Sequence, residues 1–108
     1  MRPAVPELSR RARRDLDEIR DWTVATWGRE QWQAYYRGLG TAFRRIAADP
    51  TCGRSRDVLG GRMRSLVYEK HLIFFAPVAS FGGQPVILRI LHQRRNLAGL
   101  SYLDELEG

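Results

Sequence analysis

The side chains best suited to chemistry in this chain are two histidines and a group of arginines in its second half. His71 and His92 stand at the start and at the end of two apolar segments, and imidazole can donate or accept a proton near neutral pH. Guanidinium groups accompany them and are suited to binding phosphates or carboxylates; they belong to Arg62, Arg64, Arg89, Arg94 and Arg95. These residue types favour either acid–base chemistry on an anion or recognition of an anionic partner.

The overall charge points the same way. A net charge of +6 arises from 17 arginines and a single lysine set against 12 acidic residues. This excess favours a polyanionic partner, either nucleic acid or an acidic protein surface. A GC-rich genome with solvated helix faces gives the same composition, so charge alone leaves both interpretations open. The arginine run at positions 10–14 is expected to be neutralised by nearby acids on the same helix, namely Asp15, Asp17, Glu18 and Asp21.

Several classes of site are not indicated. Cys52 is the single cysteine, so neither an internal disulfide nor a cysteine-based zinc site is expected. No glycine-rich phosphate loop, metal-ligand cluster or Ser-His-Asp pattern appears, and we expect no metal, no cofactor and no catalytic triad. The chain also lacks an apolar run of about 18 residues and a secretory h-region. A cytoplasmic protein without membrane contact is therefore predicted.

The first half of the chain predicts one short strand and two helices. Residues 3–8 contain two prolines, which suits an edge strand. Ser9 is a good N-cap, and apolar residues at helical spacing predict a helix to about Trp27, ended by Gly28. A second amphipathic helix is predicted over 30–48. Asp49-Pro50 ends it, because the residue before proline avoids helical geometry.

The second half predicts strands over 62–68, 71–78 and 86–92, separated by turn residues. Short connections favour an antiparallel meander. A further short helix is expected within 96–108. This order predicts one domain spanning 1–108, with a helical hairpin packed on one face of a three- to four-stranded, mainly antiparallel sheet. The fold class is therefore α+β.

Three finer expectations follow from this arrangement. Gly38 and Gly40 flank a core leucine, which suggests close approach of another helix backbone there. Arg89 interrupts an apolar strand, so its head should be paired or aimed into a cleft, with Asp57, Glu69 and Asp104 as candidate partners. The aromatic residues around the helical turn should mostly pack in the core, and any left exposed would mark a partner groove; they are Trp22, Trp27, Trp32, Tyr35 and Tyr36.

Six motifs in this order resemble the ParE toxins of the ParE/RelE superfamily of bacterial toxin–antitoxin systems. The first two are Leu8-Ser9-x-x-Ala12-x-x-Asp15-Leu16-x-x-Ile19 and Trp27-Gly28. Three follow in the middle of the chain: Phe43-x-x-Ile46-Ala47-x-x-Pro50-x-x-Gly53-Arg54, Gly61-x-x-Arg64 and His71-Leu72-Ile73-Phe74-Phe75. The last is Ile87-x-Arg89-Ile90-Leu91-His92-Gln93-Arg94-Arg95. Each motif is weak alone, but the ordered set is specific and spans nearly the whole chain.

The resemblance implies a toxin that inhibits DNA gyrase by binding it, without catalysis. It also implies neutralisation by a ParD-like antitoxin, a ribbon-helix-helix DNA-binding protein with a C-terminal segment that wraps the toxin. The toxin itself is not expected to bind nucleic acid sequence-specifically. The alternative is a RelE-like ribosome-dependent mRNA endoribonuclease that uses Arg62, Arg64, Arg89 and His92. Leu72 stands where RelE-like sequences usually carry Arg, and no Tyr closely follows Arg95, so the nuclease is disfavoured.

Two sets of site residues are predicted on this basis. The target-binding candidates are Arg62, Arg64, Arg89, His92, Arg94 and Arg95. The antitoxin-binding candidates, chosen to accept an amphipathic acidic segment, are Arg13, Leu16, Trp22, Tyr36, Phe74 and Leu100.

Overall fold

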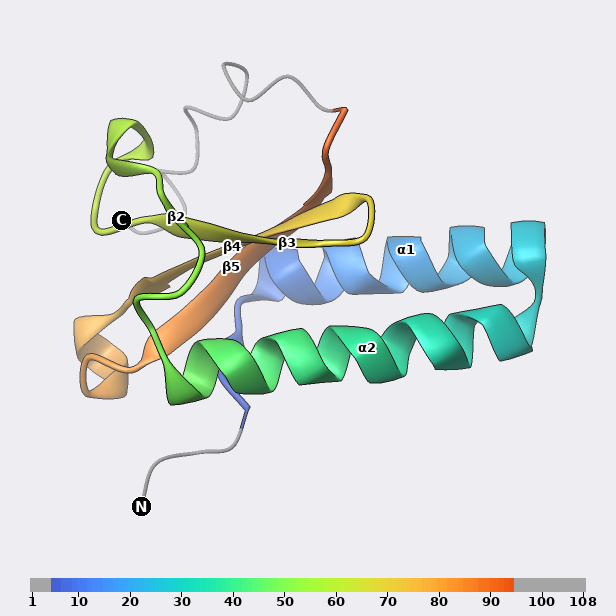
Figure 1. The fold of residues 1–108 in the computed structure, drawn as a ribbon, viewed down its shortest axis with the longest axis horizontal. Coiled ribbons are helices and arrows are strands. Elements are labelled where there is room, and N and C mark those ends of the chain that lie inside the picture. The colour runs from blue at the N-terminus through green and yellow to red at the C-terminus, as the bar shows by residue number, and fades with distance from the viewer. Residues whose placement is uncertain (1–4, 95–108) are drawn as a thin grey trace.

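The protein is a two-layer α+β domain, seen here in a computed structural model that describes residues 5–94. Two long helices, α1 (Arg10–Trp27) and α2 (Arg29–Ala48), form a hairpin against one face of the sheet (Figure 1). The strands are β1 (Glu7–Leu8), β2 (Arg54–Ser55), β3 (Arg64–Tyr68), β4 (His71–Pro77) and β5 (Pro85–His92). Two short 3₁₀ turns, η1 (Asp57–Leu59) and η2 (Ala79–Phe81), complete the order.

The sheet has five strands in the order β1-β5-β4-β3-β2. β3, β4 and β5 form the expected antiparallel meander, and β1 pairs with β5 in parallel as an edge strand. The predicted α+β class and helical hairpin are confirmed. The fifth strand, β2, is only two residues long and lies in the segment expected to be a loop, where the sequence has no alternating apolar pattern.

Ser9 joins α1 to the sheet. Its hydroxyl accepts the backbone N–H of Ala12 at 3.0 Å, which caps the helix. The same hydroxyl donates to the carbonyl of Leu88 at 2.9 Å, and the Ser9 N–H donates to the carbonyl of Ile87. One residue therefore starts the helix and continues the edge pairing of β5 beyond the end of β1.

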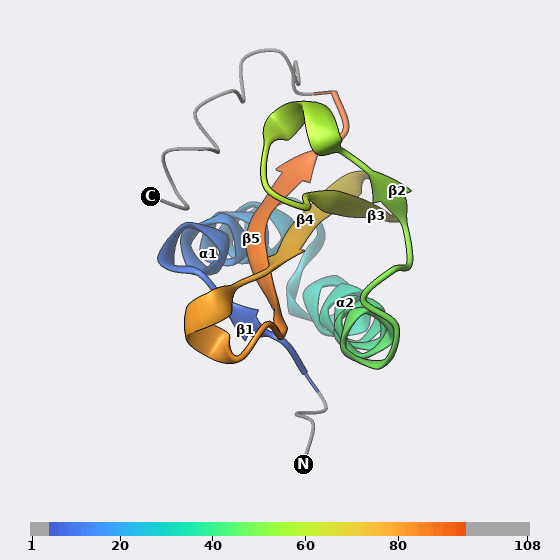
Figure 2. The same ribbon diagram turned by 90° about the vertical axis from the view of Figure 1, so that its left-hand side faces the viewer.

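Each face of the sheet carries an apolar core. The helix side buries α2 residues such as Leu39, Phe43 and Ile46 against Ile73 and Ile87. On the opposite side (Figure 2), the loop around η1 lies over the sheet and contributes Leu59 and Met63. This second core also contains residues of β4 and β5, namely Leu72, Phe74, Ala76, Val86, Leu88 and Leu91. Burial on both faces explains why β4 and β5 read as nearly continuous apolar runs.

Two local expectations were wrong. Arg62, expected to begin the strand predicted over 62–68, lies in the turn before β3, so it does not share a strand face with Arg64. Gly38 is enclosed by the side chain of Tyr68 from β3, with which a Cβ would overlap, rather than by another helix. At Gly40 an added Cβ would find only ordinary contact with Arg44. An aromatic side chain reaching from the sheet can require a helical glycine as strictly as a helix crossing does.

The expectation that the turn aromatics pack mostly in the core was also wrong. Trp22, Trp27 and Tyr36 are 63%, 67% and 51% exposed, whereas Trp32 and Tyr35 are half-buried. Figure 1 shows the reason: the hairpin extends past the end of the sheet, so its outer turns have no sheet to pack against.

Candidate functional site

The guanidinium of Arg89 is part of the protein interior. Its Nε donates to Oδ2 of Asp15 at 2.8 Å and a terminal nitrogen donates to Oδ1 at 3.1 Å, while both residues are less than 10% exposed. Asp15 Oδ2 also accepts the backbone N–H of Ile90 at 2.9 Å. The predicted acidic partners of Arg89 were wrong, and so was the role of Asp15 as a surface neutraliser of the arginine run. The ion pair fastens α1 to β5, so Arg89 is not available to a target.

Backbone irregularity explains how an arginine fits in this strand. The β4–β5 register pairs Phe74 with Arg89 and Phe75 with Ile87, so Leu88 is an inserted residue. Such a bulge re-aims neighbouring side chains. The bulge lies next to Ile87, which pairs with Leu8, the last residue of β1. Beyond this point Asp15 of α1 accepts the backbone N–H of Ile90 in β5.

The other predicted cations do not form one cluster. Arg64, at the start of β3, donates to the carbonyls of Cys52 and Gly53 at 3.0 and 3.1 Å. His92 aligns with the opposite end of β3, through His71 and Tyr68. Four residues of strand separate the two ends by about 13 Å. Arg62 is exposed in its turn, and Arg95 lies outside the described residues.

A polar and aromatic group, which we call the strand-end cluster, gathers where β4 and β5 meet the middle of α2. It consists of Tyr35, Tyr68, His71 and His92. The Tyr35 hydroxyl lies 2.5 Å from Nδ1 of His71, and the Tyr68 hydroxyl donates to the carbonyl of Tyr35 at 3.0 Å. His71 and His92 are directly paired across the strands, with ring centroids 5.5 Å apart.

The next residues of the chain close this end of the sheet. The backbone N–H of Gln93 donates to the carbonyl of Lys70, and its side-chain amide donates to the carbonyl of Glu69. The backbone N–H of Arg94 donates to Nδ1 of His92 at 3.1 Å. His92 and Arg94 are exposed.

Burial sets the protonation of the cluster. It lowers the pKa of His71 to about 4, with repulsion from the His92 charge as a second cause. Burial also raises the pKa of the Tyr35 phenol, helped by Tyr68 and Glu69. At neutral pH, His71 is therefore an uncharged imidazole and Tyr35 keeps its proton.

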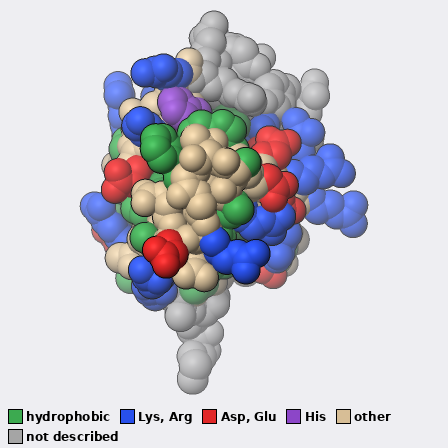
Figure 3. Space-filling model, turned by 90° about the vertical axis from the view of Figure 1, so that its right-hand side faces the viewer, with side chains coloured by type: hydrophobic (Ala, Val, Ile, Leu, Met, Phe, Trp, Pro, Cys, Tyr) green, Lys and Arg blue, Asp and Glu red, His purple; other side chains and the backbone are tan. Residues whose placement is uncertain are grey.

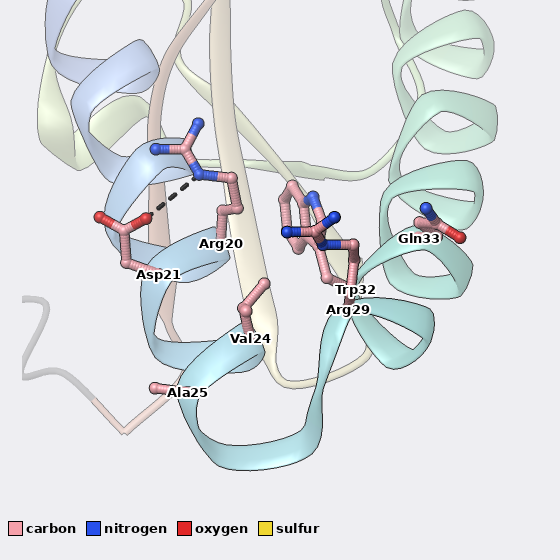
Figure 4. A pocket seen from close by; sticks show the side chains of 7 residues that line it. All are labelled: Arg20, Asp21, Val24, Ala25, Arg29, Trp32 and Gln33. Carbon is pink, nitrogen blue, oxygen red and sulfur yellow. Dashed lines mark hydrogen bonds and ion pairs between the residues drawn. The ribbon is translucent and has the colours of Figure 1, made fainter.

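A groove of about 510 Å³ opens between the two helices near the hairpin end. Val24 from α1 and Trp32 from α2 form its apolar part, and Arg20 and Arg29 flank them from the two helices (Figure 4). Asp21 also lines the groove and accepts a hydrogen bond from Arg20 at 3.2 Å. Figure 3, which looks at this end of the molecule, shows basic and acidic side chains around the rim and hydrophobic patches between them. An apolar groove with Arg29 at its border is suited to an amphipathic peptide that carries an acidic side chain.

The antitoxin-binding candidates fall into three groups. Arg13, Trp22 and Tyr36 are exposed on the hairpin, Arg13 with Glu7 4.0 Å away, and Leu16 is half-buried against the helix-side core. Phe74 is completely buried in the core on the other face and cannot contact a partner in this conformation. Leu100, like the predicted helix within 96–108, lies outside the described residues.

Sequence reasoning missed two of the residues that organise the sites. Asp15 looked like one of several surface acids, although its helical position three residues after buried Ala12 could have placed it on the inner face. Tyr35 was grouped with core aromatics, and nothing in the sequence signalled its contact with His71. Among residues 5–94, no group of three or more His, Cys, Asp or Glu side chains could hold a metal ion. Within the same range, neither helix is apolar enough over its length to cross a membrane.

Comparison with known proteins matches this architecture to one family. Residues 7–97 match the family described as the ParE toxin of the type II toxin–antitoxin system parDE. Toxin ParE1 of Mycobacterium tuberculosis is 36% identical over 90 residues, covering 83% of this chain and 90% of that toxin. Toxin ParE1 of Caulobacter vibrioides is 35% identical over 89 residues, covering 82% and 88%.

A solved structure of a chromosomal ParDE toxin–antitoxin system from P. aeruginosa has the same fold. It superimposes with a TM-score of 0.65 at 23% identity, covering 83% of this chain and 98% of that one. Family match, relatives and fold agree, and the chain belongs to the ParE toxin family of type II toxin–antitoxin systems.

Proposed function

We propose that this toxin arrests growth by binding and inhibiting DNA gyrase in the cytoplasm, and that a ParD-like antitoxin neutralises it. The observation that carries a binding rather than a catalytic mechanism is the fate of the basic residues. A nuclease needs cations converging on one phosphate. Here Arg89 is held by buried Asp15, and Arg64 binds backbone carbonyls at the far end of β3 from His92. The set required by the nuclease alternative is therefore dispersed.

The surface proposed for the target is the exposed strand end that carries His92 and Arg94, together with Arg95 beyond the described residues. Arg62 and Arg64 are proposed as a second, separate contact. The decisive experiment measures supercoiling and DNA cleavage by purified gyrase of the host bacterium with added toxin. Inhibition, or accumulation of cleaved DNA, supports the proposal.

Matched variants make the test specific. Arg94→Gln is expected to raise the toxin concentration for half-inhibition about 3- to 10-fold, the range for one lost interfacial charge contact. Arg54→Gln removes the same charge from the exposed edge strand β2 and should act like the wild type. Lack of gyrase inhibition at toxin excess, with codon-positioned cuts in toeprinting of translated mRNA, would favour the endoribonuclease instead.

The proposed antitoxin is a ribbon-helix-helix protein whose C-terminal segment is acidic and amphipathic. The hairpin offers exposed Trp22 and Tyr36 with Arg13 and half-buried Leu16 nearby on α1. Contiguous exposed apolar surface is typical of partner sites, and aromatic residues often dominate interface energy.

Co-expression with the adjacent open reading frame tests this partner. We expect growth rescue and co-purification, with Trp22→Ala weakening the complex about tenfold or more. Phe81→Ala is the matched control, since Phe81 is an exposed aromatic of η2, 47% accessible and outside the hairpin. Equal losses in both variants would argue against the hairpin as the docking surface.

A further inference from the structure

The strand-end cluster leads to an inference about what its histidines bind. His71 and His92 occupy directly opposed positions of β4 and β5, so their side chains leave the sheet on the same face. That face is the helix side, because His71 contacts Tyr35 of α2. The rings are nearly perpendicular, with centroids 5.5 Å apart, and no hydrogen bond joins them.

The hydrogen-bond partner of Nδ1 determines the tautomer of each imidazole. At His92, Nδ1 faces the backbone N–H of Arg94, which can only donate, so Nδ1 accepts and Nε2 carries the hydrogen in the neutral ring. At His71, Nδ1 faces the Tyr35 hydroxyl. A protonated phenol donates to the imidazole nitrogen, the stronger base within reach, and this also leaves the hydrogen on Nε2.

Both Nε2–H groups remain open to a ligand. Among residues 5–94, no side-chain nitrogen or oxygen is both fully buried and without a hydrogen bond. Since Nε2 of half-buried His71 has no hydrogen-bond partner within this described range, it must reach solvent. His92 is exposed. Two donors cannot satisfy one another, which accounts for the missing hydrogen bond between the rings.

We propose that His71 and His92 form a two-donor site whose Nε2–H groups together bind one carboxylate of a protein partner. Two hydrogen bonds of about 2.9 Å each, converging on one carboxylate, can bridge rings at this separation. Lys70 and Arg94 are exposed beside the site, and the negative charge of Glu69 offsets one of their two positive charges. The remaining positive charge matches the single negative charge of one carboxylate.

The surroundings favour a protein over a nucleic acid. Neighbouring rings continue from the site towards the helical groove: His71 to Tyr35 at 5.6 Å and Tyr35 to Trp32 at 6.2 Å. Trp32 lines the groove with Val24, between Arg20 and Arg29. A peptide segment can lay apolar side chains in this groove and direct an acidic one to the histidines. Nucleic-acid backbones instead depend on several cations in a row, and the path from His71 through Tyr35 and Trp32 is aromatic rather than cationic.

The test needs neither gyrase nor antitoxin, so its failure is distinguishable from failure of the proposed function. Long-range nitrogen–proton NMR spectra of the wild-type protein at neutral pH report both tautomers. Sodium acetate and dimethyl phosphate, a phosphodiester mimic, are then titrated separately at constant ionic strength. The indole N–H signals of exposed Trp22 and Trp27 serve as internal controls for non-specific anion effects.

We expect both imidazoles to be in the Nε2–H form and both to shift with acetate along one saturation curve. Dimethyl phosphate should bind at least fivefold more weakly. His92→Phe should weaken acetate binding at His71 at least tenfold. Tyr35→Phe should weaken it two- to fivefold, because His71 is then free to move its hydrogen to Nδ1.

Several results would overturn the inference. They are an Nδ1–H tautomer at either ring, a shift of one imidazole without the other, or shifts no larger than those of the tryptophan controls. Equal or tighter binding of dimethyl phosphate would reject the carboxylate assignment and point to a nucleic-acid partner. The wild-type titration stands alone, so the inference remains testable even if a variant does not fold.

Discussion

Arg89 and His92 lie three residues apart on β5, and the two positions behave in opposite ways. Arg89 is 4% exposed, and Asp15 from α1 accepts two of its hydrogen bonds. His92 is exposed, and its Nδ1 accepts the backbone N–H of Arg94. The same strand thus carries one cation that holds α1 against the sheet and one side chain that is exposed at the strand end. Helix α1 accounts for the difference, because it packs against β5 at Arg89 and leaves His92 exposed.

The largest effect on stability is expected from Asp15→Asn, which tests the structural role of Arg89. The change keeps the shape but removes the charge facing buried Arg89, and it perturbs the acceptor for Ile90 N–H. Loss of one partner of a buried pair costs about 3–5 kcal/mol. Urea unfolding should show this loss, whereas Asp17→Asn, in an exposed pair with Arg20, should cost less than about 0.5 kcal/mol. Similar stabilities for the two variants would contradict the structural role of Asp15.

The packing beneath the strand-end cluster is tested by a glycine pair on α2. In Gly38→Ala the new methyl group must displace Tyr68, which loses its hydrogen bond to the Tyr35 carbonyl. We expect a destabilisation of about 1–3 kcal/mol, typical of overpacking. Gly40→Ala meets no such obstacle and should stabilise by up to about 1 kcal/mol through helix propensity. Thermal unfolding of both variants should give shifts of opposite sign.

Acid titration examines the uncharged state of His71. Its pKa is about 4 in the fold and 6.5 in the unfolded chain, so the unfolded chain takes up the proton first as pH falls. The contribution of the buried neutral ring is complete above pH 6.5 and is lost between pH 6.5 and 4. Because the residue is only half-buried, solvent screening reduces this loss to about 1–2 kcal/mol.

The measurement is urea unfolding at several pH values across that window, for wild type and His71→Phe. The variant should lose less stability on acidification than the wild type. Identical slopes would mean that His71 is as easily protonated in the fold as in the unfolded chain.

The smallest effect on stability is expected at exposed His92. His92→Gln changes a surface side chain whose ring makes one hydrogen bond, to the Arg94 N–H. Its stability should stay within about 0.5 kcal/mol of the wild type. A loss approaching that of Asp15→Asn would show that His92 is structural too.

Local patterns predicted the helices and the main strands well. Ser9, Gly28 and Asp49 mark helix ends where the sequence placed them, because capping depends on residues close in the chain. The nearly continuous burial of β4 and β5 likewise agrees with their run of apolar and β-branched residues. The exposure of Trp22, Trp27 and Tyr36 was mispredicted. Helical periodicity shows which face of a helix is apolar, but it does not show how far along the helix the sheet covers that face.

The sequence by itself determined the α+β class, the order of the two helices and the main strands, the family and the strand-end position of His92. Only the tertiary structure decided the partner of Arg89, the contact of Tyr35 with His71, and the exposure of Trp22 on the hairpin. The physical reason is the range of the interactions. Caps and periodicity act within a few residues, whereas Asp15 and Arg89 are 74 positions apart and Tyr35 and His71 are 36 apart. Such pairs form only after packing brings distant segments together.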